Sequence, residues 1–149
     1  MMDFITKTKL LNHNIKYMYN TLKQLGIIER KTFNASVPKI YFDTHKHMFR
    51  HFLRGVIDGD GNVDKSSGTD IRICSASNKF LRELKKLLEE NNIQTGEKLL
   101  THSYNKNTHY LRFSGANKKV KNFLYKDAEN FLKYKKERIF GNNITEKVK

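Results

Sequence analysis

Apolar residues near the start of the chain recur at alternating steps of four and three, which is the spacing of one face of an α-helix. This pattern predicts an amphipathic helix over residues 8–25, and Gly26 follows where helices commonly end in a glycine cap. The next stretch, residues 29–42, is predicted to be extended, with Pro38 as a breaker. The apolar positions of the helix are Leu11, Ile15, Met18, Leu22 and Leu25.

Two further helical patterns occur in the middle of the chain. One follows Asp43 or Thr44, either of which is a candidate N-cap, and runs into Asp-Gly-Asp-Gly at 58–61. The other follows Ser77, also a candidate cap, and ends at residues 91–92. Their apolar faces are Phe49, Phe52, Leu53, Val56 and Ile57 in the first helix and Phe80, Leu81, Leu84, Leu87 and Leu88 in the second.

Alternation of apolar and polar residues predicts two β-hairpins. The first covers residues 62–76 around a Ser-Ser-Gly turn at 66–68, and the second has strands at 97–104 and 108–114. In the first, Ile71, Ile73 and Ser75 alternate with Arg72 and Cys74; in the second, His109, Leu111 and Phe113 alternate with Tyr110 and Arg112.

The order of these elements predicts the fold class. Helical spacing returns at Asn117 and predicts one or two last helices, broken near Asp127. Residues 44–140 therefore form an α+β domain of order helix, hairpin, helix, hairpin, helix, in which helices cover one face of a four-stranded antiparallel sheet and leave the other face free. Residues 1–43 are an N-terminal helical and extended segment, and the polar residues 141–149 are a flexible tail.

The charge of the chain indicates which class of partner it binds. Lys and Arg number 29 against 15 Asp and Glu, which gives a formal net charge of +14. The basic residues are interleaved with Tyr, Asn, Ser and Thr and do not line one apolar helix, so nucleic acid is favoured over a membrane as the partner. Charge alone is also compatible with a merely soluble basic protein.

The cysteine count and the apolar stretches indicate the cellular compartment. Cys74 is the only cysteine, so neither an internal disulfide nor a cysteine-based zinc site is possible. No stretch approaches the ~18 apolar residues of a membrane span, and the first residues have no apolar run of signal-peptide length. We therefore expect a soluble, intracellular protein that is not bound to a membrane.

Residues 53–61, Leu-Arg-Gly-Val-Ile-Asp-Gly-Asp-Gly, carry the most specific chemistry. Gly55 and Gly59 lie on one helix face and each costs up to ~1 kcal/mol relative to Ala, a cost that close approach of another backbone would explain. Asp58 and Asp60 stand at the C-terminal end of the helix, where the macrodipole disfavours anions by up to ~1 kcal/mol. A compensating cation such as Mg²⁺ takes ligands of this kind. The alternative is an Asp-Gly turn that simply ends the helix.

Two other metal sites are disfavoured by the sequence. A calcium loop of the EF-hand type needs Gly at its sixth place and Glu at its twelfth, and these places hold Val63 and Thr69. His45, His47 and His51 have neither an HExxH pattern nor an acidic ligand nearby, so we interpret them as surface or DNA-backbone histidines.

Residues 52–63 closely resemble the LAGLIDADG signature of homing endonucleases. In that family the motif helix packs against its counterpart from a second repeat or subunit, and the last acidic residue of each motif binds catalytic metal between the two. The resemblance implies an αββαββα domain, Asp60 as catalytic and metal-binding residue, the Gly59 carbonyl as a second ligand, and Mg²⁺ or Mn²⁺ as the metal. Asp58 would support the helix end. The matching motif positions are Leu53, Gly55, Val56, Asp58, Gly59, Asp60 and Gly61.

The resemblance continues on both sides of the motif. Residues 22–32 are similar to the stretch before the second motif of two-repeat members, and residues 114–140 are similar to the closing segment, in which one lysine reaches the active site. The matching lysine is Lys135, an implied catalytic residue. Weaker candidates are Lys133 and Lys136 in the same basic cluster, and Ser75 and Lys79, which capping and a helix-surface charge explain better.

The same resemblance implies a function. The substrate would be duplex DNA, with the free face of the sheet in the major groove. Because the chain holds one motif, activity would require a homodimer or a second repeat; an inactive remnant is the other possibility. The candidate DNA contacts are Arg72, Lys98, His102, Tyr110 and Arg112.

Alternatives without cleavage stay open. A LAGLIDADG-related intron maturase or regulator would bind nucleic acid without cutting it. Retention of Asp58, Asp60 and Lys135 favours the nuclease, an enzyme of the kind encoded by introns and other mobile elements. A helix-turn-helix module at residues 10–32 is disfavoured, because no recognition helix follows Gly26.

Overall fold

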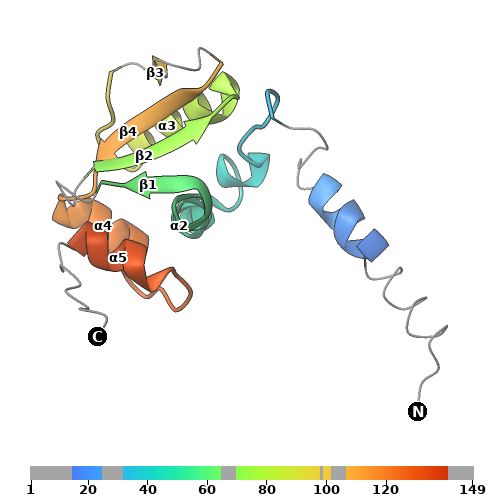
Figure 1. Ribbon diagram of the computed structural model, residues 1–149. Helices are drawn as coiled ribbons and strands as arrows, with labels where there is room; N and C mark the ends of the chain where they lie inside the picture. Colours follow the sequence, from blue (N-terminus) through green and yellow to red (C-terminus); the bar gives the residue numbers. More distant parts are fainter. Residues whose placement is uncertain (1–14, 25–31, 65–69, 98, 102–106, 141–149) are drawn as a thin grey trace, which may run out of the picture.

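The computed structural model describes residues 15–24, 32–64, 70–97, 99–101 and 107–140. Beyond a helical segment at 15–24, its elements are two short 3₁₀ helices, four strands and four α-helices, shown in Figure 1. They are η1 (Lys39–Tyr41), η2 (Lys46–Met48), α2 (Phe49–Asp60), β1 (Gly61–Val63), β2 (Asp70–Ser75), α3 (Asn78–Glu90), β3 (Leu100–Thr101), β4 (His109–Ser114), α4 (Lys118–Tyr125) and α5 (Lys133–Phe140).

The strands form one antiparallel sheet in the order β1-β2-β4-β3, which confirms the predicted α+β class. The central pair is β2 and β4, where Ile73 stands opposite Leu111 and Arg72 opposite Arg112. On β2's other edge, β1 pairs Asn62 with Arg72. The two hairpins are thus joined through their second strands.

Alternation along β2 and β4 separates a covered face from a free one. The covered face is apolar: Ile71, Ile73 and Leu111 are fully buried. The other set of positions includes the exposed Arg112 and Cys74 and the half-buried Arg72 and Tyr110. This is the arrangement expected when one face of an antiparallel sheet packs on the core and the other meets solvent.

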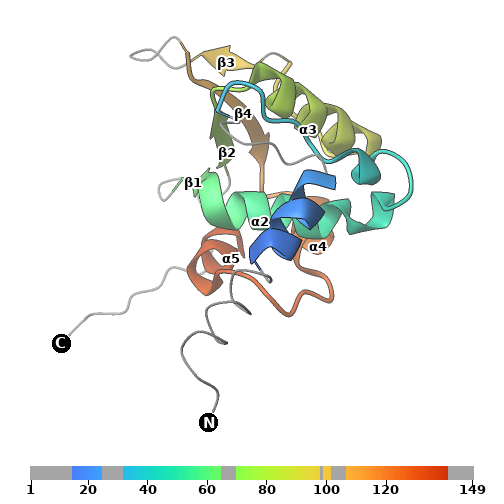
Figure 2. The same ribbon diagram turned by 90° about the vertical axis from the view of Figure 1, so that its right-hand side faces the viewer.

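Two helices cover the apolar face (Figure 2). α2 packs on β2, and α3 packs on both β2 and β4. α4 lies against α2, and α5 contacts α4 and β1. The predicted helical stripes supply this core; its fully buried members in α2 and α3 are Phe49, Leu53, Ile57, Leu81, Leu84, Leu87 and Leu88.

Two predicted helix boundaries are confirmed by capping geometry. The Ser77 hydroxyl accepts a hydrogen bond from the backbone N–H of Phe80 at 3.2 Å, the expected N-cap bond of α3. Asn117 caps α4 in the same way through Lys119. The break near Asp127 is also found, because that residue adopts φ 57° between α4 and α5.

The start of α2 was predicted wrongly. Neither Asp43 nor Thr44 caps it: α2 begins at Phe49 after η2, and the Thr44 hydroxyl is bonded to the ring of His45. The predicted extended stretch is also only partly extended, since Lys39–Tyr41 forms a 3₁₀ turn directly after Pro38. Proline pre-sets the φ angle of a turn as readily as it interrupts a helix, which explains the 3₁₀ turn after Pro38.

The chain before α2 is tied to α3. Val37 is buried in the core, and its backbone N–H donates to the Glu83 carboxylate at 2.7 Å. The Ser77 hydroxyl donates to the Ala35 carbonyl at 2.7 Å. Residues 35–37 therefore cross α3 as a strap fixed by polar contacts at both ends.

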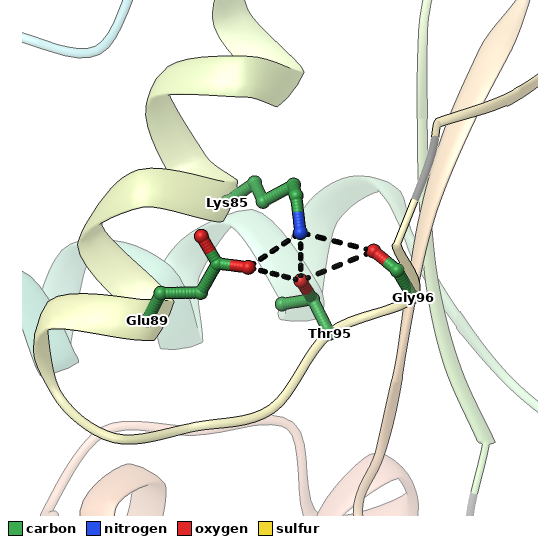
Figure 3. A network of polar contacts seen from close by, with 4 residues as sticks. All are labelled: Lys85, Glu89, Thr95 and Gly96. Atoms are coloured by element: carbon green, nitrogen blue, oxygen red, sulfur yellow. Dashed lines mark hydrogen bonds and ion pairs between the residues drawn. The ribbon is translucent and has the colours of Figure 1, made fainter.

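The C-terminal end of α3 is fixed to the chain that leads into β3 (Figure 3). Lys85 Nζ donates to the Thr95 hydroxyl at 2.8 Å and to the Gly96 carbonyl at 3.0 Å, and it pairs with the Glu89 carboxylate. β3 is shorter than the predicted strand at 97–104, of which residues 98 and 102–104 lie outside the described residues. The turn at 66–68 lies outside them too.

Only part of the predicted N-terminal helix is described. Residues 15–24 are helical, and residues 8–14 and 25 lie outside the described part. Ile15, Met18 and Leu22, its predicted apolar face, are exposed. The predicted tail at 141–149 also lies outside.

Candidate active site at the end of α2

The site predicted from the motif lies where α2 turns into β1. Asp60 is the last residue of the helix, and Gly61 is at once the C-cap and the first residue of β1, opposite Ile73. A Cβ on Gly61 would lie 2.6 Å from the Ile57 carbonyl oxygen, so any larger residue would push the strand away from the helix. Glycine at this position is required by space and holds Asp60 at the junction.

Asp60 presents an unengaged carboxylate. Its side chain is exposed, and it makes no hydrogen bond or ion pair with any residue in the described part of the chain. Gly59, whose carbonyl is the other predicted ligand, is exposed as well. No group of three or more His, Cys, Asp or Glu residues close enough to hold a metal ion occurs among the described residues. Within the described part of the chain, the Asp60 carboxylate is therefore not a member of such a cluster.

Lys135 reaches the same helix end from α5. Its ammonium group is buried and donates to three main-chain carbonyls, those of Ile57 at 2.6 Å, Asp58 at 2.7 Å and Gly61 at 2.8 Å. An ammonium group has three N–H donors, so all of them are engaged. Lys135 therefore adds a donor to main-chain carbonyls at the junction of α2 and β1, where the Ile57 carbonyl also accepts from the Gly61 N–H.

This contact changes the electrostatic argument made from the sequence. Carboxylates at the negative pole of a helix need a compensating cation, and the ammonium of Lys135 is such a cation. The macrodipole alone therefore does not call for a metal at this place. The case for one rests on the unengaged carboxylate of Asp60.

Asp58 ties the chain before α5 to α2. Its Oδ2 accepts a hydrogen bond from the Leu132 N–H at 3.1 Å. Its Oδ1 and the hydroxyl of Tyr125 are both buried without a hydrogen-bond partner among the described residues. Burial, and secondarily the negative charge of Asp58, raises the pKa of Tyr125. The phenol therefore stays neutral.

Arg54 is a buried cation that the sequence analysis did not single out. Its guanidinium donates to the Leu124 carbonyl at 2.8 Å and to the Asn130 carbonyl at 2.9 Å, and its Nη2 lies 2.8 Å from His51 Nδ1. It thus fixes the end of α4 and the connection to α5 against α2. The available signal was an arginine between the apolar positions of the motif helix.

His51 lies between two arginines. Arg54 faces its Nδ1, and Arg50 Nε lies 3.2 Å from its Nε2. Partial burial lowers the pKa of His51, and the charges of Arg54, Arg50 and His47 lower it further. A neutral imidazole accepts at one nitrogen only, so one of the two contacts forms in a given tautomer.

Two glycines of the motif, Gly55 and Gly59, face open space. No atom of the described residues lies within 4 Å of a Cβ placed on Gly55 or Gly59. Packing within the described chain therefore does not explain why the helix carries two glycines, each of which lowers helix stability relative to Ala. Beside Gly55 runs an open groove of about 570 Å³, whose wall includes Asp58 and Leu132.

The remaining predicted residues fall into three groups. Arg72, Tyr110 and Arg112 lie on the free face of the sheet, whereas Lys98 and His102 lie outside the described residues. The Ser75 hydroxyl accepts from the Ser77 N–H, and Lys79 pairs with Glu83 at 3.9 Å on the surface of α3. Lys133 is exposed beside Glu137, and Lys136 Nζ lies 4.1 Å from the ring centroid of Phe131.

Two acidic residues on the free face were missed. Arg72 Nη2 donates to Asp64 at 2.9 Å, and Arg112 pairs with Asp70. Asp70 and Arg72 occupy alternate positions of one strand, and such opposite charges on one strand face could have been recognised in the sequence.

Comparison with known proteins agrees with the fold and the motif. Residues 48–136 match the family model described as a LAGLIDADG-like domain. Over 121 residues, or 80% of the chain, the sequence is 31% identical to a probable translation initiation factor IF-2 of Methanocaldococcus jannaschii. The match spans 10% of that protein's length. No helix in the described part of this chain is long and apolar enough to cross a membrane.

Proposed function

Because the chain belongs to the family of LAGLIDADG-like domains, which indicates a nuclease or DNA-binding role, we propose that it is a homing endonuclease that cleaves duplex DNA. The observation that carries the proposal is the state of Asp60. Nearby polar groups are engaged in holding the helix end, whereas the Asp60 carboxylate is exposed and unengaged at the junction of α2 and β1. A carboxylate kept in this way is suited to a ligand from outside the described chain.

The ligand is a divalent metal, Mg²⁺ or Mn²⁺, held by the Asp60 carboxylate and the Gly59 carbonyl. Hard cations of this kind take oxygen ligands. Such a metal supplies a Lewis acid for the scissile phosphate and a water of lowered pKa. Since the described residues furnish one carboxylate, a second copy of the motif, from a homodimer or another repeat, completes the site.

The open face of α2 fits the second copy. Gly55 and Gly59 leave space into which another backbone can move, and close packing would account for two glycines in a short helix. Pairing through this face would bring two Asp60 carboxylates together. Lys135 then supports each helix end, and its catalytic role stays a prediction.

Duplex DNA is the substrate that the charge favours. The chain carries +14, and the free face of an antiparallel ribbon fits the major groove. Residues 44–140 would form the catalytic domain, with residues 1–43 as an extension and 141–149 as a tail.

The test is a cleavage assay on a library of duplex sites with Mg²⁺, comparing wild type, Asp60→Asn and Asp43→Asn. Asp43 is exposed upstream of η2 and controls for the loss of one carboxylate charge. We expect Asp43→Asn to cut like wild type and Asp60→Asn to bind DNA but not cut. Cleavage by Asp60→Asn at the wild-type rate would overturn the assignment.

The alternative function is nucleic-acid binding without cleavage, as in a maturase or regulator. It is favoured by the complete engagement of Lys135, which leaves Asp60 as the one unengaged group of the predicted pair. Binding of duplex DNA by wild type with no cleavage in Mg²⁺ or Mn²⁺ would select this alternative.

A further inference from the structure

The free face of the sheet holds two copies of the same diagonal ion pair. Arg72 and Arg112 stand directly opposite each other on β2 and β4. Each reaches one strand over and two positions along to an aspartate, Arg72 to Asp64 and Arg112 to Asp70. The aspartates also face each other, because the Asp64 N–H donates to the Asp70 carbonyl at 3.1 Å.

This arrangement resolves a conflict of charge. Two arginines directly opposite on a sheet repel each other, and diagonal neighbours are within reach of long side chains. The aspartates offset that repulsion, and the charges of these four described side chains sum to zero, two positive and two negative. In a chain of net charge +14, the centre of the free face is thus locally neutral.

A neutral centre is poorly suited to attracting phosphates but well suited to reading bases. Each aspartate accepts from Nη2, one nitrogen of a guanidinium that has five N–H donors in a rigid fork. The donors not used by the carboxylate match the O6 and N7 acceptors of guanine in the major groove. Fixing the fork in advance reduces the rotamer entropy lost when the base contact forms.

We propose that Asp64 and Asp70 are specificity-determining residues that hold Arg72 and Arg112 for two guanines of the DNA site. This inference rests on the proposed binding of duplex DNA. The Cα atoms of opposed residues are ~5 Å apart and base pairs rise ~3.4 Å, so the two guanines lie on neighbouring or next-but-one base pairs.

The experiment is selection of sites from a randomised duplex library by the full-length chain without divalent metal, so that cleavage plays no part. The variants are Arg72→Ala, Arg112→Ala, Asp64→Asn and Asp70→Asn. The control is Glu90→Gln, which removes the same charge from an ion pair with Lys86 on α3, the helix on the opposite face of the sheet. Arg112→Lys keeps the charge and removes the fork, and thermal unfolding checks that every variant folds.

Wild type should select two guanines within two base pairs of each other. Each Arg→Ala variant should lose preference at one of them by about 5- to 150-fold, and Arg112→Lys should lose it at the Arg112 position. The Asp→Asn variants should bind unrelated duplex more tightly, with a log-log salt slope steeper by about 0.9, and should discriminate less at the matching guanine. Glu90→Gln should leave the preferences unchanged.

Two results would overturn the inference while leaving DNA binding intact. The first is that the sites selected by wild type lack two guanines within two base pairs of each other. The second is that the Asp→Asn variants keep the base preferences of wild type. Failure of wild type to bind any duplex would instead remove the proposed function itself. The two failures are therefore distinguishable in one experiment.

Discussion

Lys135 donates a hydrogen bond of 2.7 Å to the main-chain carbonyl of Asp58, which lies 77 positions earlier in the chain. The contact joins the last described helix to the end of the motif helix. It also places a positive charge at the negative pole of α2, next to Asp58, which directly precedes Gly59 and Asp60. The position of the candidate metal ligand thus depends on a residue outside the motif.

Replacing Lys135 with Met should destabilise the fold. The substitution keeps much of the apolar stem but removes one donor from three carbonyls, of which that of Ile57 still accepts from the Gly61 N–H. An unsatisfied buried acceptor costs ~1–3 kcal/mol. We expect a loss of about 3 kcal/mol or more in the free energy of unfolding, measured by urea denaturation. Lys133→Met, at an exposed position in the same helix, is the control and should change stability by less than about 0.5 kcal/mol. Equal stability of the two variants would mean that the cap contributes nothing.

The pH dependence of stability should include a contribution from His51. Its pKa in the folded chain is lowered from 6.5, so below about that pH the unfolded chain binds more protons than the folded one. The free energy of unfolding should therefore fall as the pH drops through 6.5 toward the lowered pKa of the folded chain. His51→Gln should show a shallower fall over this window in denaturant titrations. An unchanged pH profile in the variant would assign the effect to other groups.

Local patterns predicted most of the fold. The helical stripes of α2 and α3, the alternation in β2 and β4 and the cap Ser77 depend on neighbours in sequence, and these features were predicted correctly. The start of α2 was missed because η2 precedes it and Met48, its N-cap, makes no side-chain capping bond that would mark the boundary. The strap at residues 35–37 was missed because it depends on contacts with α3. Such contacts leave no periodic signal.

The site was less predictable than the fold for the same reason. Asp60 is marked by the motif, but the engagement of Lys135 with three carbonyls joins residues more than 70 positions apart. Arg54 is similarly bonded to carbonyls of residues 124 and 130. Backbone acceptors carry no residue signature, so the partners of these cations were not visible in the sequence.

Gly55 should tolerate a side chain in the isolated chain and not in the assembly. No described atom lies within 4 Å of a Cβ at this position, so Gly55→Ala should raise the stability of the monomer by up to ~1 kcal/mol through helix propensity. Gly55→Leu should fold normally but lose pairing, because a large side chain would hold a second helix away. Sedimentation at several concentrations, together with thermal unfolding, measures both effects. Unaltered association of Gly55→Leu would exclude this face as the seam.

Affinity for duplex DNA should fall steeply with salt. A chain of net charge +14 that follows a long groove neutralises several phosphates, and each contact contributes about −0.9 to the slope of log affinity against log salt. Six contacts would give a slope of roughly −5.

Because Arg72 and Arg112 are already paired with aspartates, their replacement by Ala should leave the slope on unrelated duplex nearly unchanged. Replacement of two unpaired basic residues that contact phosphates should instead make the slope shallower by about 1.8. Titration of an unrelated duplex over a range of salt concentrations measures the slope for each variant. A slope near zero for wild type would mean that the basic surface does not contact the phosphate backbone, and a loss of slope in the Arg72 and Arg112 variants would make these residues phosphate contacts instead of base contacts.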